Sequence, residues 1–350
     1  MITVKELPSV LGNCASAEEW QTRREEIKEI LQREEYGYFP PVVDCRVASK
    51  LVSKNEFAGK AVAEELMFVL KNGEKEFYFP AKMIYPNNKD KDIPFFVFIN
   101  FAPDVPHKYY YPEVIVDRGV GVLSFCYNDV SVDGSSFGKG MECLFMDGST
   151  RNDTCFGKIT LWAYAMQRGL DYLLTRPEAD STRIFAAGHS RLGKTALLAA
   201  AFDERFAGVH SNNSGSSGAA IARDKEGETV EAICNRFPYW FCKNYHKYAN
   251  KENEMPFDQH FLLALVAPRK ISVAAALEDT WADSYNQYLA CLGANEAYEL
   301  LGEQGIVTED ERQILGKEYI GGNISYRERT GTHFFSYHDW SFAIDALIGK

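Results

Sequence analysis

The sequence predicts an α/β fold: a mostly parallel central sheet with helices on both faces, arranged as a three-layer sandwich. Two observations predict it. Residues 93–100 and 120–125 are short, almost continuous apolar runs, which are typical of strands covered on both faces. Segments with helical spacing, such as 159–174, lie between such runs, and strands that alternate with helices favour parallel pairing. No repeat, low-complexity tract or Pro/Gly/Ser linker divides the 350 residues, so one domain is expected over residues 1–350.

The first 85 residues differ from the rest in their pattern of polar and apolar residues. Residues 18–36 carry apolar side chains at helical spacing and predict a leading helix, within a segment 1–40 that packs on the domain. Residues 44–85 hold alternating polar and apolar stretches, and Asn72-Gly73 is a turn signal between two of them. This part of the chain therefore predicts an antiparallel meander.

The remaining elements follow from the same two kinds of pattern. Residues 192–202 are rich in Ala and Leu, which favours a helix, and residues 342–348 close the chain with another. Besides the two runs already named, short apolar segments predict four further strands, at 183–187, 206–210, 270–277 and 319–326.

Charge and composition exclude several classes of function. The chain holds 38 Lys and Arg against 49 Asp and Glu, a formal charge of −11, which disfavours a nucleic acid or an anionic membrane as a partner. No apolar run reaches the roughly 18 residues that a membrane-spanning helix needs. The eight Cys form no C-x-x-C pair and do not crowd with His, so reduced thiols and no metal site are expected. No basic stretch leads into a long apolar core at the N-terminus, so a cytoplasmic location is expected.

The segment 184–194 carries the chemistry. A predicted buried strand ends in Gly188-His189-Ser190 and passes at once into a predicted helix, which is the layout of a nucleophile elbow. Such a turn lifts the serine hydroxyl above the edge of the sheet and directs the N–H of the next residue, Arg191, at a developing oxyanion. Gly-x-Ser alone also fits a glycine turn with a Ser helix cap, and Leu192 stands where the motif usually has its second glycine. The strand before and the helix after favour the nucleophile.

A serine nucleophile needs a base, and a histidine in the last part of the chain is expected to supply it. In elbow-bearing α/β folds the order along the chain is Ser, acid, His. Of the seven His, only His333 and His338 follow the last predicted strand. His333 lies in a predicted loop, where a catalytic imidazole belongs, whereas His338 falls in or near the final helix. His260 precedes an apolar run, and a core role is expected for it.

The acid that orients the base has two standard places. Residues 212–215, after one strand, hold no carboxylate. Residues 270–277 lead into Glu278 and Asp279. Alternation along the predicted strand places Asp279, just past its end, on the same parity as the apolar residues Ile271, Val273, Ala275 and Leu277. Asp279 is therefore preferred and Glu278 is the second choice; a solvated acidic loop remains the alternative.

Residues 188–194 resemble the G-x-S-R-x-G-K motif of the glucuronoyl esterases, carbohydrate esterase family 15 in the α/β-hydrolase superfamily. The likeness covers most of the chain and keeps its order, and the further matching stretches are 202–207, 214–220, 237–241, 278–283 and 329–333. The resemblance implies an α/β-hydrolase fold. It also implies hydrolysis of an ester on the carboxyl group of a glucuronic acid, typically a 4-O-methylglucuronate of xylan linked to a lignin alcohol, and thus a role in xylan degradation.

The resemblance also assigns roles by position. It implies Ser190 as nucleophile, His333 as general base and Arg191 as an oxyanion donor through its side chain as well as its N–H. Many members, the fungal ones especially, carry Glu where this chain has Asn213, while some bacterial members use an acid after the seventh strand, and Asp279 fits those. The resemblance implies a sugar site made of Lys194, Glu228 and Trp281.

The residue types of the implied sugar site suit a pyranose. Lys194 lies one helical turn after Ser190, so both can face one cleft, and an aromatic face suits the apolar side of a sugar ring. Taken alone, Lys194 also fits a surface charge, Trp281 a core aromatic and Glu228 a solvated loop residue.

The expected function is a serine carboxylic-ester hydrolase that forms an acyl-enzyme and needs no cofactor. Its expected partner is a small-molecule or oligosaccharide uronate ester. Two alternatives remain open at this point: another carbohydrate ester specificity, such as an acetyl xylan esterase or other deacetylase, and a non-catalytic carbohydrate-binding relative.

Overall fold

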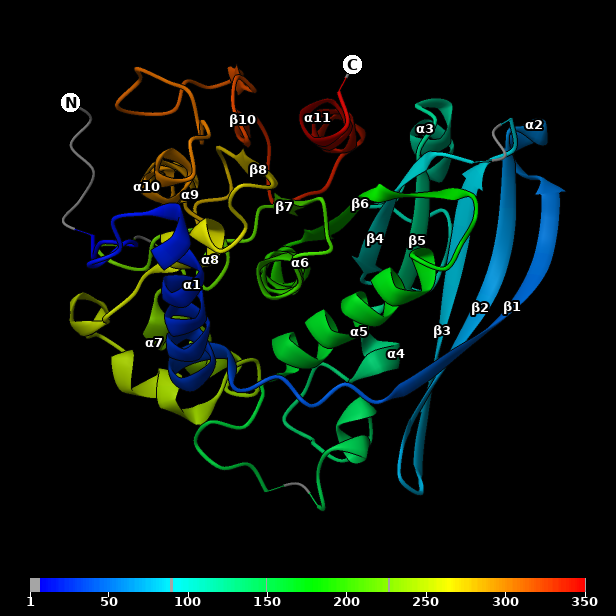
Figure 1. Ribbon diagram of the computed structural model, residues 1–350, viewed down its shortest axis with the longest axis horizontal. Helices are drawn as coiled ribbons and strands as arrows, with labels where there is room; N and C mark the ends of the chain where they lie inside the picture. The colour runs from blue at the N-terminus through cyan, green and yellow to red at the C-terminus, as the bar shows by residue number, and fades with distance from the viewer. Residues whose placement is uncertain (1–6, 89–90, 149, 226, 350) are drawn as a thin grey trace.

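Six parallel strands form the centre of a ten-stranded sheet in the computed structural model, which describes residues 7–88, 91–148, 150–225 and 227–349. The sheet order is β1-β2-β3-β5-β4-β6-β7-β8-β10-β9, and every pairing from β5 to β10 is parallel (Figure 1). These six strands are β4 (Ile93–Asn100), β5 (Gly121–Cys126), β6 (Ala179–His189), β7 (Gly208–Asn212), β8 (Lys270–Ala276) and β10 (Ile324–Arg329). The predicted mostly parallel sheet is confirmed.

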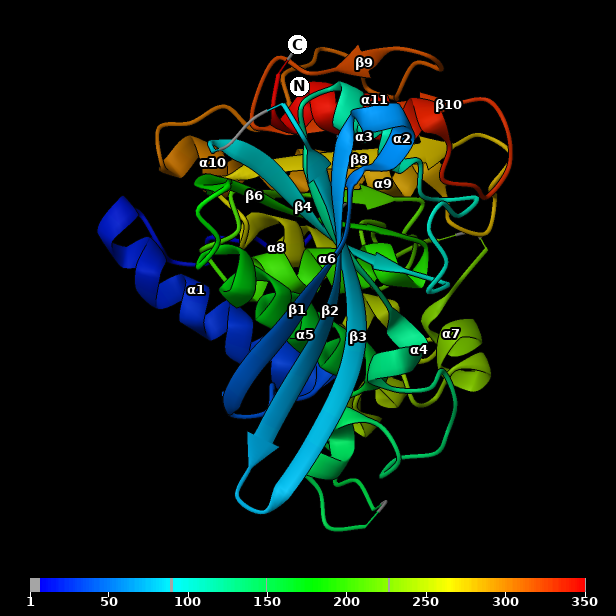
Figure 2. The same cartoon turned by 90° about the vertical axis from the view of Figure 1, so that its right-hand side faces the viewer.

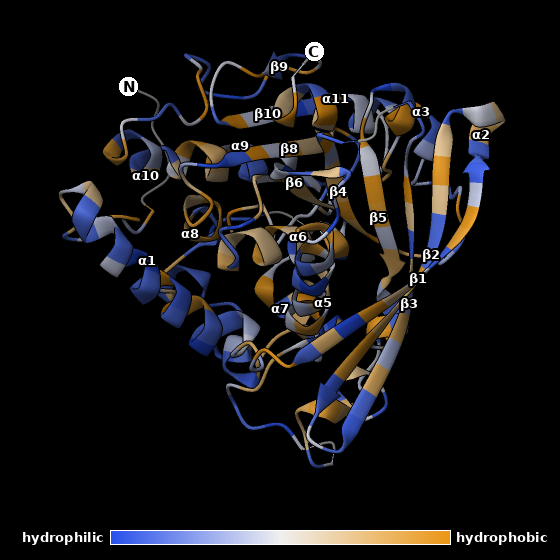
Figure 3. Ribbon diagram, turned by 45° about the vertical axis from the view of Figure 1, so that its right-hand side comes forward, coloured by the Kyte–Doolittle hydropathy of each residue, from blue (hydrophilic) through white to orange (hydrophobic). Residues whose placement is uncertain are grey.

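Helices cover both faces of the parallel strands. On β4, Phe95, Val97 and Ile99 pack into one hydrophobic cluster, which includes side chains of α5 (Lys158–Leu173) and α6 (Arg191–Phe202). The alternate residues Phe96 and Phe98 pack into a second cluster with α3 (Pro112–Asp117) and α11 (Tyr337–Leu347). Apolar colour follows the central strands in Figure 3, whereas the surface helix α1 (Ala17–Leu31) is mostly polar. The molecule therefore has three layers, as predicted.

The predicted meander is also present. It consists of β1 (Asp44–Asn55), β2 (Ala61–Asn72) and β3 (Lys75–Pro86), which pair antiparallel and extend beyond the parallel strands (Figure 2). The β2–β3 hairpin closes at the predicted turn, where Asn72 pairs with Lys75 and Gly73 has a φ of 60°. Positive φ is readily adopted by glycine, so the Asn-Gly signal identified this turn correctly.

Several predicted elements differ from the structure at their ends. The stretch 319–326 is not one strand: β9 (Glu318–Tyr319) and β10 are separate and pair antiparallel. Gly322 lies between them so close to the backbone that an added Cβ would be 2.0 Å from the Gly305 carbonyl oxygen. The leading helix changes into a π-helix, η1 (Gln32–Tyr36), and α11 begins five residues before its predicted start.

The other helices connect the strands and build the remaining surface. Short helical turns are α2 (Glu56–Gly59), α4 (Tyr127–Val130), η2 (Met141–Leu144), η3 (Lys243–Tyr248) and η4 (Glu252–Glu254); the longer connections hold α7 (Val230–Arg236), α8 (Gln259–Ala264), α9 (Ser284–Gly293) and α10 (Asn295–Leu300). None of the helices in the described ranges combines the length and the apolar character needed to span a membrane. Residues 1–6 of the predicted leading segment 1–40 lie outside the described residues.

Candidate active site

Ser190 lies at the sharp turn between β6 and α6. Its φ of 59° and ψ of −131° describe a backbone conformation that is strained for a residue with a side chain. Its N–H donates to the Asn212 carbonyl at 2.8 Å. An added Cβ on Gly188 would be 2.0 Å from the Leu192 carbonyl oxygen, so position 188 admits no side chain. Gly193 is the second close approach, with an added Cβ at 3.1 Å from Ser211 Oγ, while Leu192 is buried in the core. This geometry accounts for the shifted second glycine of the motif.

His333 and Asp279 meet in the loops that follow β10 and β8. Nδ1 of His333 lies 2.6 Å from Oδ2 of Asp279, whose side chain is only 4% exposed. Nδ2 of Asn213 donates to the same carboxylate oxygen at 2.7 Å. Burial alone would raise the pKa of Asp279, but the hydrogen bonds from His333 and Asn213 hold the pKa below its ordinary value. The carboxylate is therefore ionised and able to stabilise an imidazolium.

Glu278, the second choice for the acid, points elsewhere. Its exposed carboxylate accepts a hydrogen bond from the Gly331 N–H at 3.0 Å and supports the backbone of the histidine loop. His338 is exposed in the first turn of α11. His260 is buried, with Nε2 2.8 Å from the Pro8 carbonyl, which confirms its predicted core role.

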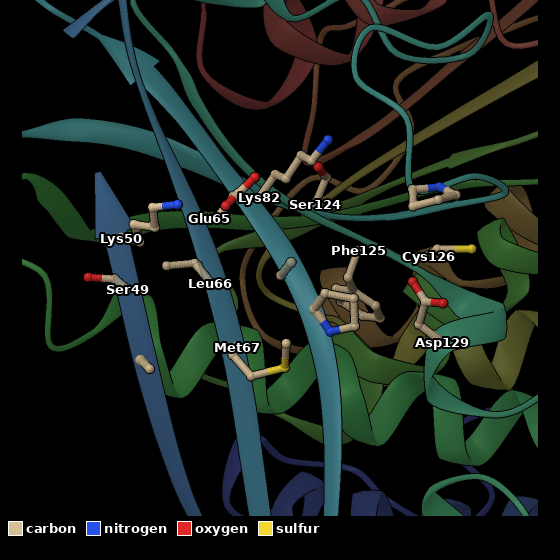
Figure 4. A pocket seen from close by; sticks show the side chains of 14 residues that line it. Ser49, Lys50, Glu65, Leu66, Met67, Lys82, Ser124, Phe125, Cys126 and Asp129 are labelled. Carbon is tan, nitrogen blue, oxygen red and sulfur yellow. The ribbon is translucent and has the colours of Figure 1, made fainter. Parts of the chain in front are cut away.

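Ser190, Asp279 and His333 line one cavity of about 280 Å³, together with Asn213 and Arg191. A second cavity, of about 340 Å³, opens among β1, β2, β3 and β5 (Figure 4). It is lined mainly by apolar side chains such as Leu66, Met67 and Phe125, and none of the predicted site residues reaches it. The reactive groups therefore gather in the smaller cavity.

Arg191 extends its guanidinium along one wall of the site cavity. Nη1 pairs with Oδ2 of Asp133, and the guanidinium carbon lies 4.7 Å from the ring centre of Trp240 and 5.3 Å from that of Phe237. Asp133 is a functional contact that the sequence analysis missed. It lies 58 residues before Arg191 in an irregular segment, so neither periodicity nor spacing could have signalled it.

Lys194, Glu228 and Trp281 form one connected network. Nζ of Lys194 lies 2.9 Å from Oε2 of Glu228, and Nε1 of Trp281 donates to the other oxygen at 3.0 Å. Lys194 and Glu228 are buried, whereas Trp281 is 42% exposed, so none of the three has the surface, solvated-loop or core role considered as an alternative. Burial lowers the pKa of Lys194, and the Glu228 carboxylate opposes that change. All three line the cavity that holds Ser190.

His189, the middle residue of the Gly-x-Ser motif, packs against the predicted base. Its ring centre lies 4.6 Å from that of His333, and burial holds the pKa of His189 well below its ordinary value, so the ring is neutral. Nδ2 of Asn212 contacts both His189 Nδ1 (2.9 Å) and the Phe334 carbonyl (2.9 Å). This amide therefore ties the end of β7 to the loop that carries His333.

The arrangement suits acyl transfer. Ser190 lies at a strained turn and caps the N-terminus of α6, and the guanidinium of Arg191 lies beside it. The buried carboxylate of Asp279 orients the imidazole of His333. The network of Lys194, Glu228 and Trp281 adds fixed polar groups and an exposed aromatic ring to the same cavity.

Comparison with known proteins gives a consistent result. A family model described as "Glucuronyl esterase, fungi" matches residues 69–302. The chain is 36% identical to "Carbohydrate esterase MZ0003" of an unknown prokaryotic organism, over 67% of this chain and 54% of that protein. It is 31% identical to a 4-O-methyl-glucuronoyl methylesterase of Podospora anserina, over 89% of this chain and 61% of that protein. The chain thus spans between half and two thirds of the length of these relatives.

Two solved structures cover nearly the whole chain. A glucuronoyl esterase from Solibacter usitatus superposes with a TM-score of 0.89 at 30% identity, over 99% of this chain and 98% of that one. A CE15 glucuronoyl esterase from Teredinibacter turnerae T7901 superposes with a TM-score of 0.86 at 29% identity, over 97% of this chain and 87% of that one.

Proposed function

The chain belongs to the glucuronyl esterase family and has the α/β-hydrolase fold, and from this premise we propose that it hydrolyses carbohydrate esters of glucuronic acid through a serine acyl-enzyme. The preferred substrate class is a 4-O-methylglucuronoyl ester, the class named for the Podospora anserina relative. The observation that carries the proposal is the convergence of Ser190, His333 and Asp279 on one cavity.

In the proposed mechanism, Ser190 Oγ attacks the ester carbonyl carbon while His333 takes the hydroxyl proton. Asp279 accepts the Nδ1–H of His333, which leaves Nε2 as the basic nitrogen and stabilises the imidazolium that forms. The carbonyl oxygen becomes an oxyanion, which the N–H and the guanidinium of Arg191 stabilise. The tetrahedral intermediate then collapses, and the alcohol leaves with the proton from His333.

The second half of the reaction repeats these roles with water. His333 removes a proton from a water molecule, which attacks the acyl carbon of the Ser190 ester. Collapse of the second intermediate returns the proton to Ser190 Oγ and releases the uronic acid. The network of Lys194, Glu228 and Trp281 holds the sugar ring, with the indole against its apolar face and the buried charges fixing its hydroxyl groups.

The test is a rate comparison on two substrates: benzyl glucuronate and an acetylated xylo-oligosaccharide. Ser190→Ala is expected to lower kcat on the uronate ester by about a thousandfold or more, while Ser341→Ala, which changes an exposed hydroxyl on α11, leaves it unchanged. Equal rates for Ser190→Ala and the wild type would overturn the assignment of the nucleophile. Faster hydrolysis of the acetyl ester would indicate a deacetylase. Failure of Ser190 to react with a fluorophosphonate probe would indicate a non-catalytic binding protein.

A further inference from the structure

Asp133 is a carboxylate that contacts two residues of the site cavity, Arg191 and Trp240, and the proposed mechanism leaves it without a role. Its Oδ2 pairs with Nη1 of Arg191, the guanidinium that we assign to the oxyanion. Its Oδ1 accepts a hydrogen bond from Nε1 of Trp240 at 2.7 Å. The side chains of Asp133 and Arg191 are 12% and 23% exposed, so the pair is shielded from most of the solvent and more effective than a surface ion pair.

The second contact of Asp133 fixes the surface on which Arg191 lies. Trp240 and Phe237 stack in parallel, with ring centres 3.8 Å apart, and the Arg191 guanidinium lies over both rings. One carboxylate therefore holds the guanidinium and the indole beneath it at the same time. An arginine side chain is flexible in isolation, and these contacts reduce its freedom before substrate binds.

A hydrogen bond to Asn128 and a buried cluster two residues earlier hold the segment that carries Asp133. Its N–H donates to Oδ1 of Asn128 at 2.9 Å. Two residues earlier, Ser131 Oγ lies 2.6 Å from Glu142 Oε2 and 2.6 Å from Lys158 Nζ. Glu142 and Lys158 form an ion pair whose side chains are almost completely buried. Buried pairs of this kind are costly to break, so the segment that carries Asp133 is a fixed support.

We propose that Asp133 is a positioning residue for Arg191, with two effects on the reaction. It holds the guanidinium where the oxyanion forms, and it offsets part of the positive charge. The ester substrate is neutral at its carbonyl, whereas the uronic acid product is an anion that an unpaired arginine would bind through two parallel hydrogen bonds. By fixing the guanidinium where the oxyanion forms, Asp133 favours the short-lived intermediate, and by occupying Nη1 it weakens the two-point binding of the product. This inference rests on the proposed function.

The test is Asp133→Asn, assayed on benzyl glucuronate with glucuronate as a product inhibitor. The amide has one acceptor oxygen in place of two, so the contact with Arg191 or the contact with Trp240 is lost, and the negative charge is lost with it. We expect kcat to fall about tenfold, with KM changed less than about threefold, because orientation matters most in the transition state. We expect the inhibition constant of glucuronate to fall about fivefold, because Arg191 is no longer paired.

Three further variants make the test decisive. Asp133→Glu restores the charge and is expected to recover weak product inhibition. Trp240→Phe keeps a ring under Arg191 but removes the N–H that Asp133 accepts, so a smaller loss of kcat is expected, and this variant carries the test if Asp133→Asn does not fold. Asp153→Asn, a change of an exposed carboxylate, is the matched control and should leave kcat, KM and inhibition unchanged.

The outcomes separate this inference from the proposed function. If the wild type does not hydrolyse the uronate ester, the proposed function fails; calorimetric titration with glucuronate, which needs no turnover, still measures the effect of Asp133 on uronate binding. If the wild type is active, and Asp133→Asn leaves kcat within twofold and the affinity for glucuronate unaltered, the role of Asp133 is wrong. Loss of kcat together with weaker glucuronate binding would also overturn it, because that result describes general damage to the site.

Discussion

At the scale of single residues, two adjacent carboxylates have different environments. Asp279 is buried, and its carboxylate contacts the side chains of His333 and Asn213. Glu278 is exposed, and its carboxylate accepts a hydrogen bond from the backbone N–H of Gly331. Both residues lie beyond the end of β8, in a turn in which the Asp279 N–H donates to the Ala276 carbonyl at 3.1 Å, and this turn sends the two side chains to different surroundings. Their chemical roles should differ accordingly.

We expect Asp279→Asn to lower kcat on a uronate ester by about a thousandfold, since the amide cannot stabilise the imidazolium and disturbs the tautomer of His333. Glu278→Gln is the matched control: its side-chain oxygen still accepts the Gly331 N–H, and kcat should stay within about threefold of the wild type. Steady-state kinetics of both purified variants, with circular dichroism to confirm folding, decides the matter. Similar losses in the two variants would show that Asp279 is not the orienting acid.

Chain order limited the choices for Ser190, His333 and Asp279. The parity argument for Asp279 was wrong, because β8 ends at Ala276 and Leu277, which has the same parity, is exposed. Sequence reasoning missed Asp133 and the amide of Asn213 as contacts of the site, although Asn213 was noted as lacking a carboxylate. Both contacts join segments far apart in the chain, and their geometry depends on loop conformations that no local pattern specifies.

At the scale of elements, the loop between β10 and α11 shows why boundaries are hard to predict. The apolar pattern begins at Phe342, but α11 begins at Tyr337 because Ser336 and Asp339 form a reciprocal capping box. Asp339 also accepts hydrogen bonds from Arg329 Nε at 3.0 Å and from Arg327 at 2.9 Å. One buried carboxylate thus starts the helix and anchors the loop that carries His333.

Asp339→Asn is expected to lower the free energy of unfolding by about 3–5 kcal/mol, because Arg327 and Arg329 lose their buried counter-charge. Burial alone would raise the pKa of Asp339, but Arg329 and Ser336 hold the pKa below its ordinary value of 3.8. A lowered pKa stabilises the fold above pH 3.8, and this contribution disappears as the pH falls below that value. Urea unfolding at pH 7 measures the loss.

The comparison for this prediction is Asp345→Asn on the same helix. Asp345 pairs with Arg118 near the surface, so its removal should cost less than about 1 kcal/mol. Equal losses from the two substitutions would contradict the anchoring role of Asp339.

At the scale of the whole molecule, the site collects the carboxyl ends of four parallel strands. Ser190 follows β6, Asn213 follows β7, Asp279 follows β8 and His333 follows β10. Because parallel strands end at one edge of the sheet, this convergence was predictable from the strand order along the chain. The sequence did not predict that the N-terminal segment connects to the site. The hydroxyl of Tyr36 donates to the Ser217 carbonyl at 2.9 Å, behind the loop that Lys194 contacts.

The same N-terminal segment buries a carboxyl group whose ionisation affects the stability of the whole fold. Glu35, in the π-helix η1, is fully buried and receives hydrogen bonds from Nε2 of Gln259 at 3.1 and 3.0 Å. Burial raises the pKa of Glu35 from 4.5 to about 7, and the bonds from Gln259 only partly oppose this. The described structure gives Glu35 no cationic partner within salt-bridge distance, so its negative charge is costly inside the protein.

A raised carboxyl pKa means that the folded state holds its proton more tightly than the unfolded chain. Stability is therefore greatest below pH 4.5 with respect to this group and is lost as the pH rises to about 7, by about 3 kcal/mol in all. The side chain introduced by Glu35→Gln cannot ionise. We therefore expect the difference in free energy of unfolding, variant minus wild type, to be about 2 kcal/mol larger at pH 8 than at pH 5. Glu25→Gln, which alters an exposed carboxylate on α1, should follow the wild-type profile. Urea denaturation at both pH values measures the difference, and parallel profiles for the wild type and Glu35→Gln would show that Glu35 does not titrate in this range.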